Sequence, residues 1–273
     1  MNMRHVLGKK WFIVLEAAIT VLLFLVCAYA GRQHLDFLNH GRSAVTSIEM
    51  LYGPAVMLAS GRGFYQPNLN ASPVLREFLR NERETLSPGD LPGLLPEEPN
   101  SVSAYHRYLL YTVALFWRIL GISWTSLELL CAMLLGVCAV AVYGILRLGM
   151  GRLLSAALTL FFVLSPQMLT MLPSLRDFSK APFILLLIFL LGVLIKYRFG
   201  MKALAGISVL LGLVNGIAMG FRQDALVFIL PACIIVTVSV FRYERPFLRR
   251  RLLAPVLLLA AFFAAGHPML GRM

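Results

Sequence analysis

The sequence predicts an all-α polytopic membrane protein with about seven transmembrane helices and a large first extracytoplasmic loop that carries membrane-parallel helices. Three observations support this fold class. Hydrophobic residues make up 59% of the 273-residue chain, charged residues make up 14%, and the mean hydropathy is +0.78. A water-soluble domain usually has about 45–50% apolar and about 25% charged residues, so this chain has too little polar surface to cover itself in water. The apolar residues also form runs of membrane-spanning length, and the basic residues gather between alternate runs.

The first apolar run, residues 11–30, follows a basic N-terminus and therefore resembles a signal peptide. It is longer than the apolar part of a typical signal peptide and further spans follow it, so we interpret it as an uncleaved span. Crossing about 30 Å of hydrocarbon requires about 20 apolar residues. We predict the remaining spans near residues 124–146, 153–172, 178–195, 203–221, 225–241 and 252–270.

The segment 31–107, between the first two spans, is the sizeable loop of the chain. Residues 87–99 are rich in proline and glycine and are expected to be irregular. Residues 47–60 have apolar side chains at helical spacing, and the glycines that follow in Gly61-Arg62-Gly63 allow a helix end and a tight turn. We therefore expect a helix there, with a kink at Gly53-Pro54.

A second helix is predicted over residues 104–120. Its apolar part, residues 108–120, makes about 20 Å of helix at about 1.5 Å per residue, which is too short to span. Aromatic and basic side chains flank the apolar ones, as in helices that lie along a membrane surface. We therefore predict that this helix rests in the outer interface and does not cross.

The distribution of charge supports that interpretation. If the short helix does not cross, the cytoplasmic segments are the N-terminus, 147–152, 196–202 and 242–251. Their charged residues account for the whole net charge of +12, as the positive-inside rule expects. These residues are Arg4, Lys9, Lys10, Arg147, Arg152, Lys196, Arg198, Lys202, Arg242, Glu244, Arg245, Arg249, Arg250 and Arg251.

We therefore predict a single membrane domain over residues 1–273, with a cytoplasmic N-terminus and an extracytoplasmic first loop. The expected location is the bacterial cytoplasmic (inner) membrane. The basic charge is then a topology signal and a contact for anionic membrane lipids, and nucleic acid is not expected as a partner.

Ionisable residues gather in two of the later outer connections. Residues 173–182 include Arg176, Asp177 and Lys180, and the next outer connection contains Arg222 and Asp224. Charges at the membrane edge need a partner or a ligand. Asp177 either pairs with a neighbouring cation and caps the following helix, or engages a reacting group or metal while the cations hold phosphate. Asp224 either caps a solvated turn or lines the same site.

Two acids within spans and the cysteines complete the candidates. Glu16 and Glu128 lie near the ends of the first and second spans, where they can reach polar surroundings, and we assign them no role. The cysteines have neither a Cys-x-x-Cys pair nor a zinc-like spacing to histidine. We expect them to be packing residues.

Four segments resemble the GT-C superfamily of membrane glycosyltransferases, which includes protein mannosyltransferases and aminoarabinose transferases. They are the helix-then-glycine segment Glu49–Tyr65, the loop-helix segment Tyr105–Trp124, Leu164-Ser165-Pro166 with Arg176-Asp177 beyond it, and Gly216–Arg222. The order of a basic N-terminus, one span, a large first loop and paired spans is also similar. Members are usually longer, so the chain is expected to be a truncated or minimal member.

The resemblance implies transfer of a sugar from a polyprenyl-phosphate carrier to a glycan, lipid or protein acceptor at the outer face of the membrane. An acid near the acceptor would act as general base or hold a divalent cation. Family members carry a prominent acid soon after the first span. Asp36 has that position, whereas Glu49 better suits the spacing to the Gly61 turn, and Asp177 is the candidate acid of the later connection.

The resemblance also implies a phosphate site. Arg176, Lys180 and Arg222 are the expected ligands of the donor phosphate. Two other functions remain open at this point. A transporter or flippase of lipid-linked sugars would have polar residues near the middle of the bilayer and internal repeats, and a non-catalytic membrane protein would need neither feature.

Overall fold

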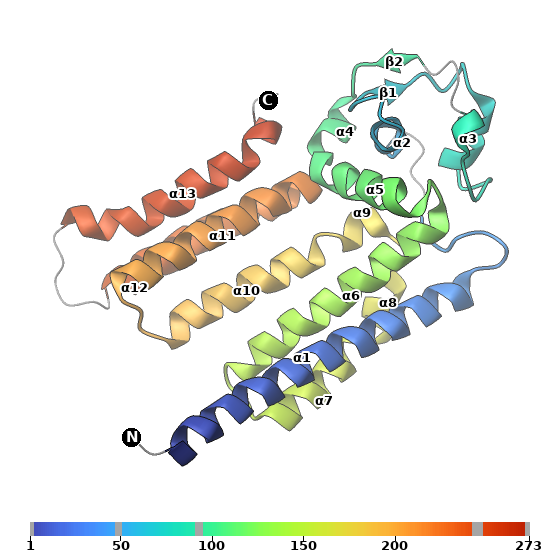
Figure 1. Ribbon diagram of the computed structural model, residues 1–273. Helices are drawn as coiled ribbons and strands as arrows, with labels where there is room; N and C mark the ends of the chain where they lie inside the picture. The colour runs from blue at the N-terminus through green and yellow to red at the C-terminus, as the bar shows by residue number, and fades with distance from the viewer. Residues whose placement is uncertain (1–2, 47–50, 91–94, 242–247, 271–273) are drawn as a thin grey trace.

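The computed structural model describes residues 3–46, 51–90, 95–241 and 248–270 (Figure 1). Long helices lie side by side in a bundle, and a small unit formed by the first loop covers one end of it. We call this end the loop end and the opposite end, where α6 and α10 finish, the basic end. The prediction of an all-α architecture of long helices is therefore confirmed.

The bundle begins with α1 (Met3–Leu38), which packs along α6 (Trp124–Arg147). The chain returns from the basic end through α7 (Arg152–Val163) and α8 (Pro166–Met171). The remaining helices are α9 (Leu175–Phe178), α10 (Ala181–Lys196), α11 (Met201–Phe221), the 3-10 helix η2 (Gln223–Phe228), α12 (Ile229–Phe241) and α13 (Leu248–Leu270).

Among the described residues, five helical stretches are long and apolar enough to cross a membrane. They are Ile13–Leu38, Trp124–Arg147, Leu175–Lys196, Met201–Phe221 and Gln223–Val240. The apolar stretches Arg152–Val163 and Leu252–Pro268 are shorter. The chain is therefore an integral membrane protein by its helices, and the number of seven spans stays a prediction.

The predicted span at 153–172 is not one continuous helix. Helix α7 ends at Val163 and α8 starts at Pro166, with Ser165 in an extended conformation between them. Proline lacks the N–H that a continuing helix would use, and its ring clashes with the carbonyl four residues earlier. The prolines inside α13, in contrast, do not end that helix.

The first loop folds into a unit of short elements. It contains α2 (Gly53–Ala59), α3 (Pro73–Leu79), the 3-10 turn η1 (Pro88–Asp90), α4 (Ser101–Tyr105), α5 (Arg107–Leu120) and the antiparallel strands β1 (Gln66–Pro67) and β2 (Pro96–Glu97). Gly61 and Gly63 have φ of 78° and 84°, which confirms the predicted turn after the helix. The first part of the predicted helix, residues 47–50, lies outside the described residues.

Aromatic side chains form the core of this unit. Tyr52, Phe78, Trp117 and Trp124 are fully buried, and their ring centroids lie 5.5–6.4 Å apart. The indole nitrogens donate to backbone carbonyls, from Trp124 to Phe78 at 2.7 Å and from Trp117 to Ser123 at 2.9 Å. Because Trp124 is also the first residue of α6, this core fixes the first loop to the bundle.

The predicted surface helix at 104–120 is present as two helices. His106 ends α4 and begins α5, and α5 lies across the loop end of the bundle (Figure 1). One face of α5 is buried against α2 and the core, whereas Leu115, Ile119 and Leu120 on another face are exposed. An exposed apolar face is what a helix in a membrane interface requires.

Candidate functional site

The charged residues predicted from the two outer connections meet at the loop end. Asp177 belongs to α9, a single helical turn that starts after Pro173, and the Ser174 hydroxyl donates to its Oδ2 at 3.1 Å. The Pro173 carbonyl accepts a hydrogen bond of 2.9 Å from the Thr46 N–H of the first loop. Helix α9 is therefore held between the bundle and the loop.

Helix α11 and η2 bring the second pair of charges to the same place. Arg222 is the C-cap of α11, and Asp224 lies in the first turn of η2. The buried amide of Asn215 supports this turn, because in its hydrogen-bonded orientation it donates to the Ala225 carbonyl at 2.9 Å and accepts from the Ile229 N–H at 3.1 Å. Asn215 of α11 thus fixes the direction that the chain takes after this helix ends.

Five side chains form a continuous chain of ion pairs, which we call the outer cluster: Arg176, Asp177, Arg222, Asp224 and Lys180. Arg176 Nε lies 3.3 Å from Asp177 Oδ1, and Arg222 pairs with that same oxygen. Arg222 Nε also lies 3.2 Å from Asp224 Oδ2, with which Lys180 pairs. The outer cluster holds three cations and two carboxylates and is partly exposed, so it has one excess positive charge and is accessible to a ligand.

His106 of the first loop lies within electrostatic range of the outer cluster. Burial lowers the pKa of its imidazole, and the positive charges of Arg176 and Arg222 lower it further, while Asp224 and the Val102 carbonyl act in the opposite direction. His106 Nδ1 lies 2.9 Å from the Val102 carbonyl oxygen. Since a carbonyl only accepts, Nδ1 carries the proton and Nε2 of the neutral ring has a free lone pair.

The outer cluster is a poor site for the divalent cation that the resemblance implies. Each of its carboxylates is already bound by two cationic side chains, and Arg222 stands between the two. A metal ion would have to displace these cations. Among the residues that the structure describes, no three His, Cys, Asp or Glu side chains gather in a way that could hold a metal ion.

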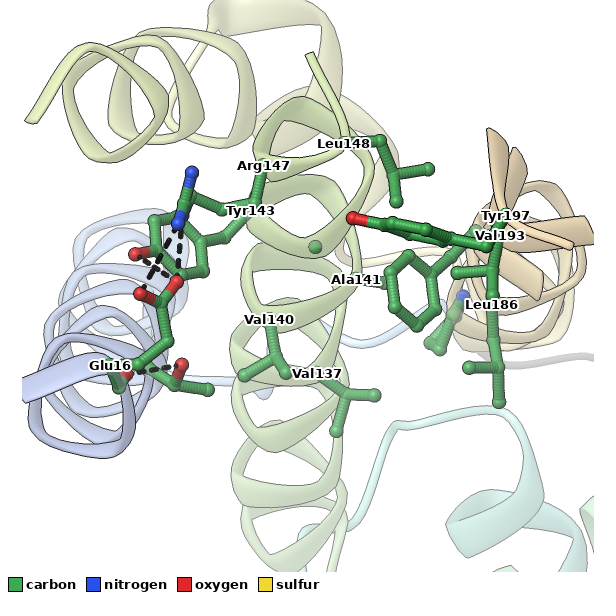
Figure 2. Close-up of a pocket in the computed structure, with 14 residues that line it drawn as sticks. Glu16, Val137, Val140, Ala141, Tyr143, Arg147, Leu148, Leu186, Val193 and Tyr197 are labelled. Atoms are coloured by element: carbon green, nitrogen blue, oxygen red, sulfur yellow. Dashed lines mark hydrogen bonds and ion pairs between the residues drawn. The ribbon is translucent and has the colours of Figure 1, made fainter. Parts of the chain in front are cut away.

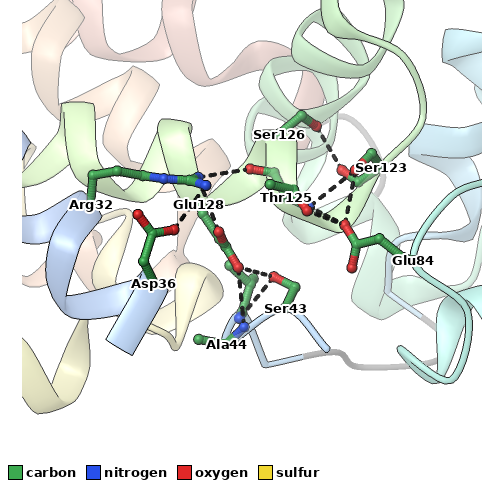
Figure 3. Close-up of polar contacts among 10 residues, drawn as sticks. Arg32, Asp36, Ser43, Ala44, Glu84, Ser123, Thr125, Ser126 and Glu128 are labelled. Atoms are coloured by element: carbon green, nitrogen blue, oxygen red, sulfur yellow. Dashed lines mark hydrogen bonds and ion pairs between the residues drawn. The ribbon is translucent and has the colours of Figure 1, made fainter. Parts of the chain in front are cut away.

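Asp36 lies in a different polar group, shown in Figure 3. Arg32 Nη2 pairs with Asp36 Oδ1 at 2.9 Å, one turn further along α1, and Arg32 Nη1 lies 3.0 Å from Glu128 Oε2. Glu128 is fully buried and accepts hydrogen bonds from the Ser43 hydroxyl at 2.8 Å and the Ala44 N–H at 3.2 Å. This group joins α1, α6 and the start of the first loop.

A second contact in Figure 3 joins the loop to α6. Glu84 Oε1 accepts from the Thr125 N–H at 2.6 Å and from the Ser123 hydroxyl at 3.0 Å, and the Thr125 hydroxyl also donates to it. Glu84, from the later part of the loop, therefore binds the first turn of α6, and Glu128 of α6 binds the start of the loop at Ser43 and Ala44. These contacts are structural, because both carboxylates are occupied by donors of the protein itself.

The structure thus brings together four of the predicted site residues, Arg176, Asp177, Lys180 and Arg222. Within the described part of the chain, neither a hydrogen bond nor an ion pair joins Asp36 to them. Glu49 lies outside the described residues. His106 is not among the predicted site residues, since a histidine between two short helices has no distinctive spacing in the sequence, and only the folded loop brings it near the cations.

Comparison of the chain with family models, with curated proteins and with solved structures finds no match. The functional assignment therefore depends on the residues of the chain itself.

Proposed function

We propose that the protein is a glycosyltransferase that moves a sugar from a polyprenyl-phosphate carrier to a glycan, lipid or protein acceptor at the outer face of the membrane. One observation carries this proposal. Three cations from two separate connections, Arg176 and Lys180 from one and Arg222 from the other, converge at the loop end of an apolar bundle. A polyprenyl-phosphate donor has the matching chemistry, with an apolar chain for the bilayer and an anionic group for its edge.

The outer cluster suits a phosphate because of its excess positive charge. Arginine guanidinium groups bind phosphate oxygens through paired N–H donors, and such charge-assisted hydrogen bonds are the strong ones in proteins. Asp177 and Asp224 keep Arg222 in place before the donor arrives. We therefore assign Asp177 to positioning the arginines, which bind the leaving phosphate as its charge develops.

The transfer itself needs a base. The bond between the sugar C1 and the phosphate oxygen breaks, and a bond between C1 and the acceptor hydroxyl oxygen forms. The acceptor proton passes to the base, and polyprenyl phosphate leaves with the electron pair of the broken bond. We assign the base to His106 Nε2, because burial and the nearby cations Arg176 and Arg222 lower the pKa of the imidazole and so favour its neutral form. Asp36 and Glu49 are the alternatives from the sequence pattern.

The test is release of polyprenyl phosphate from a mixture of polyprenyl-phosphate sugars, measured by mass spectrometry in membranes that contain the protein. This readout requires no knowledge of the sugar. Arg222→Gln should lower the rate about 100-fold, the usual cost of removing one group that stabilises developing charge. The rate of release by Arg222→Lys should lie between the rates of Arg222→Gln and the original protein, because lysine keeps the positive charge but lacks the paired N–H donors.

Asp177→Asn should also lower the rate strongly while the protein stays folded. A matched control is Asp90→Asn, which removes the carboxylate paired with Arg83 at 3.2 Å elsewhere in the first loop. Unchanged release in the folded Arg222→Gln and Asp177→Asn variants would contradict the proposal.

A further inference from the structure

A groove at the basic end of the bundle is separate from the outer cluster. It lies between α1 and α10, with α6 as its floor, and has a volume of about 490 Å³ (Figure 2). Its walls are apolar and include Val137, Val140, Leu186, Phe189 and Val193. Ligand sites in proteins commonly have volumes of about 300–1,000 Å³, so the groove can hold a ligand of moderate size.

One end of this groove is polar. The Glu16 carboxylate of α1 accepts hydrogen bonds from Arg147 Nε at 2.7 Å, from Arg152 Nε at 2.7 Å and from the Tyr143 hydroxyl at 2.9 Å. Figure 2 shows the contacts of Tyr143 and Arg147. Lys196, at the end of α10, donates to the Leu148 carbonyl beside it. Glu16 thus pairs with Arg147 and Arg152, and Lys196 adds a third cation beside Leu148, which lines the groove. These four side chains have a net charge of +2 when they are ionised.

Arg147 and Lys196 have N–H donors that are not bound by any of the residues that the structure describes. A guanidinium has five N–H donors, and Arg147 uses three of them, two on Glu16 and one on the Met150 carbonyl at 2.5 Å. Of the three donors of the Lys196 ammonium, one is on the Leu148 carbonyl. The polar end can therefore accept an anion without loss of its internal contacts.

Exposed aromatic side chains indicate the depth of this site. Trp11 and Tyr197 are 72% and 47% exposed at the basic end, and such residues typically lie at the level of lipid headgroups. Glu16 lies five residues after Trp11, which is about 7 Å deeper along the helix. The apolar part of the groove then extends from the depth of Glu16 towards the middle of the membrane.

We propose that this groove binds an anionic phospholipid from the surrounding leaflet. The phosphate contacts Arg147 and Lys196, and one acyl chain lies along the apolar walls over α6. The charge of the site selects an anionic over a zwitterionic headgroup. The proposal does not depend on the proposed sugar transfer, which takes place at the other end of the bundle.

Native mass spectrometry of the full chain, released from vesicles of equal parts phosphatidylglycerol and phosphatidylcholine, tests the proposal. The original protein should retain phosphatidylglycerol in preference to phosphatidylcholine. Lys196→Gln should lower this preference about fivefold, the effect of one cation near an anionic headgroup. Val140→Trp should fill the groove and lower the retention of both lipids. Lys202→Gln, which removes an exposed cation from the start of α11, is the control and should change nothing.

Glu16→Gln separates a binding site from a purely structural ion-pair group. The variant removes the negative charge that competes with the phosphate, so the preference for phosphatidylglycerol should rise. A group that only holds the helices together would instead give lower stability without increased preference. Equal retention of the two lipids by the original protein, or an unchanged preference in both Lys196→Gln and Glu16→Gln, would overturn the proposal.

Discussion

Glu128 of α6 joins the bundle to the start of the first loop. Its carboxylate is fully buried, and it lies 3.0 Å from Arg32 and accepts hydrogen bonds from the loop at Ser43 and Ala44. The ion pair with Arg32 and the hydrogen bonds to Oε1 offset the cost of burying this carboxylate.

The first prediction concerns this carboxylate. Glu128→Gln should lower the free energy of unfolding by about 3 kcal/mol, because it leaves the Arg32 guanidinium without its buried partner. Thermal unfolding of the detergent-solubilised protein measures the change. Asp36→Asn is the matched control, because Asp36 pairs with the same Arg32 but is 42% exposed, and it should cost less than about 1 kcal/mol. Equal losses for the two variants would contradict this account.

Asp36→Asn also separates the candidate bases. If His106 is the base, Asp36→Asn should leave the release of polyprenyl phosphate almost unchanged, and His106→Gln should lower it about 100-fold. His40→Gln replaces an exposed histidine after α1 and serves as the control. A loss in Asp36→Asn with normal release in His106→Gln would reverse the assignment.

The pH dependence of transfer gives a further prediction for His106. The pKa of its imidazole is lowered from the ordinary value of 6.5, mainly by burial. The neutral ring accepts the proton, so the rate should decrease as the pH falls and the ring becomes protonated, with the midpoint of the decrease below pH 6.5. The pH profile of release checks this. A midpoint above pH 6.5 would show that another group is the base.

At the scale of single residues, the sequence could predict that charges in the outer connections need partners. It could not predict which partner each would have. Asp177 and Arg222 belong to different connections, and they meet only because α11 ends beside α9. His106 and Glu128 obtain their surroundings from segments far away in the chain, so their roles depend on the fold.

At the scale of elements, small residues of α11 allow a close approach to α13. A Cβ atom on Gly216 would lie 2.6 Å from the Phe262 carbonyl oxygen, and one on Gly212 would meet the Leu258 carbonyl. One turn further, Gly220 lies against the Tyr108 ring, whose hydroxyl donates to the Ala265 carbonyl at 2.5 Å. Glycines every four residues let helix backbones approach closely within a membrane.

This contact leads to a prediction for stability. Gly216→Ala should lower the free energy of unfolding by about 1–3 kcal/mol, because the added methyl group overpacks the contact with α13. Gly206→Ala, on the same helix, adds its Cβ in open space and should be neutral or stabilising by up to about 1 kcal/mol. Thermal unfolding of both variants provides the comparison. A loss in Gly206→Ala as large as in Gly216→Ala would show that packing against α13 is not the cause.

The helix boundaries show what could be predicted at this scale. Apolar runs indicated the long helices, since hydropathy and length determine where a span can form. The break between α7 and α8 was missed although Pro166 was visible, because prolines also occur inside membrane helices, as Pro255 does in α13. The division at His106 depends on the packing of the first loop and has no clear signal in the sequence.

At the scale of the whole molecule, the polar groups separate to the two ends of the bundle. The outer cluster and the Glu128 group lie at the loop end, and Glu16 with its arginines lies at the basic end. The two proposals require the outer cluster and the groove to lie in opposite leaflets of the membrane. The outer cluster has to face the side where sugars are transferred, and the groove has to face the leaflet that the basic segments contact.

Labelling of engineered cysteines tests this arrangement. Glu97→Cys lies in β2 of the first loop and Gly149→Cys lies between α6 and α7, where an added side chain meets open space. Of the native thiols, Cys27, Cys131 and Cys138 are buried, and Cys233→Ala removes the half-buried one. An impermeant maleimide should label Glu97→Cys in intact cells and Gly149→Cys only after lysis, because the basic connections stay on the cytoplasmic side.

The result bears on both proposals together. If Gly149→Cys is labelled in intact cells and Glu97→Cys is not, the outer cluster faces the cytoplasm, where it cannot transfer sugars outside. The polar end of the groove would then lie in the outer leaflet, away from the anionic lipids that attract basic residues at the cytoplasmic surface. Labelling of both cysteines in intact cells would place an additional crossing between them, and the short helix α5 is the segment that would have to supply it.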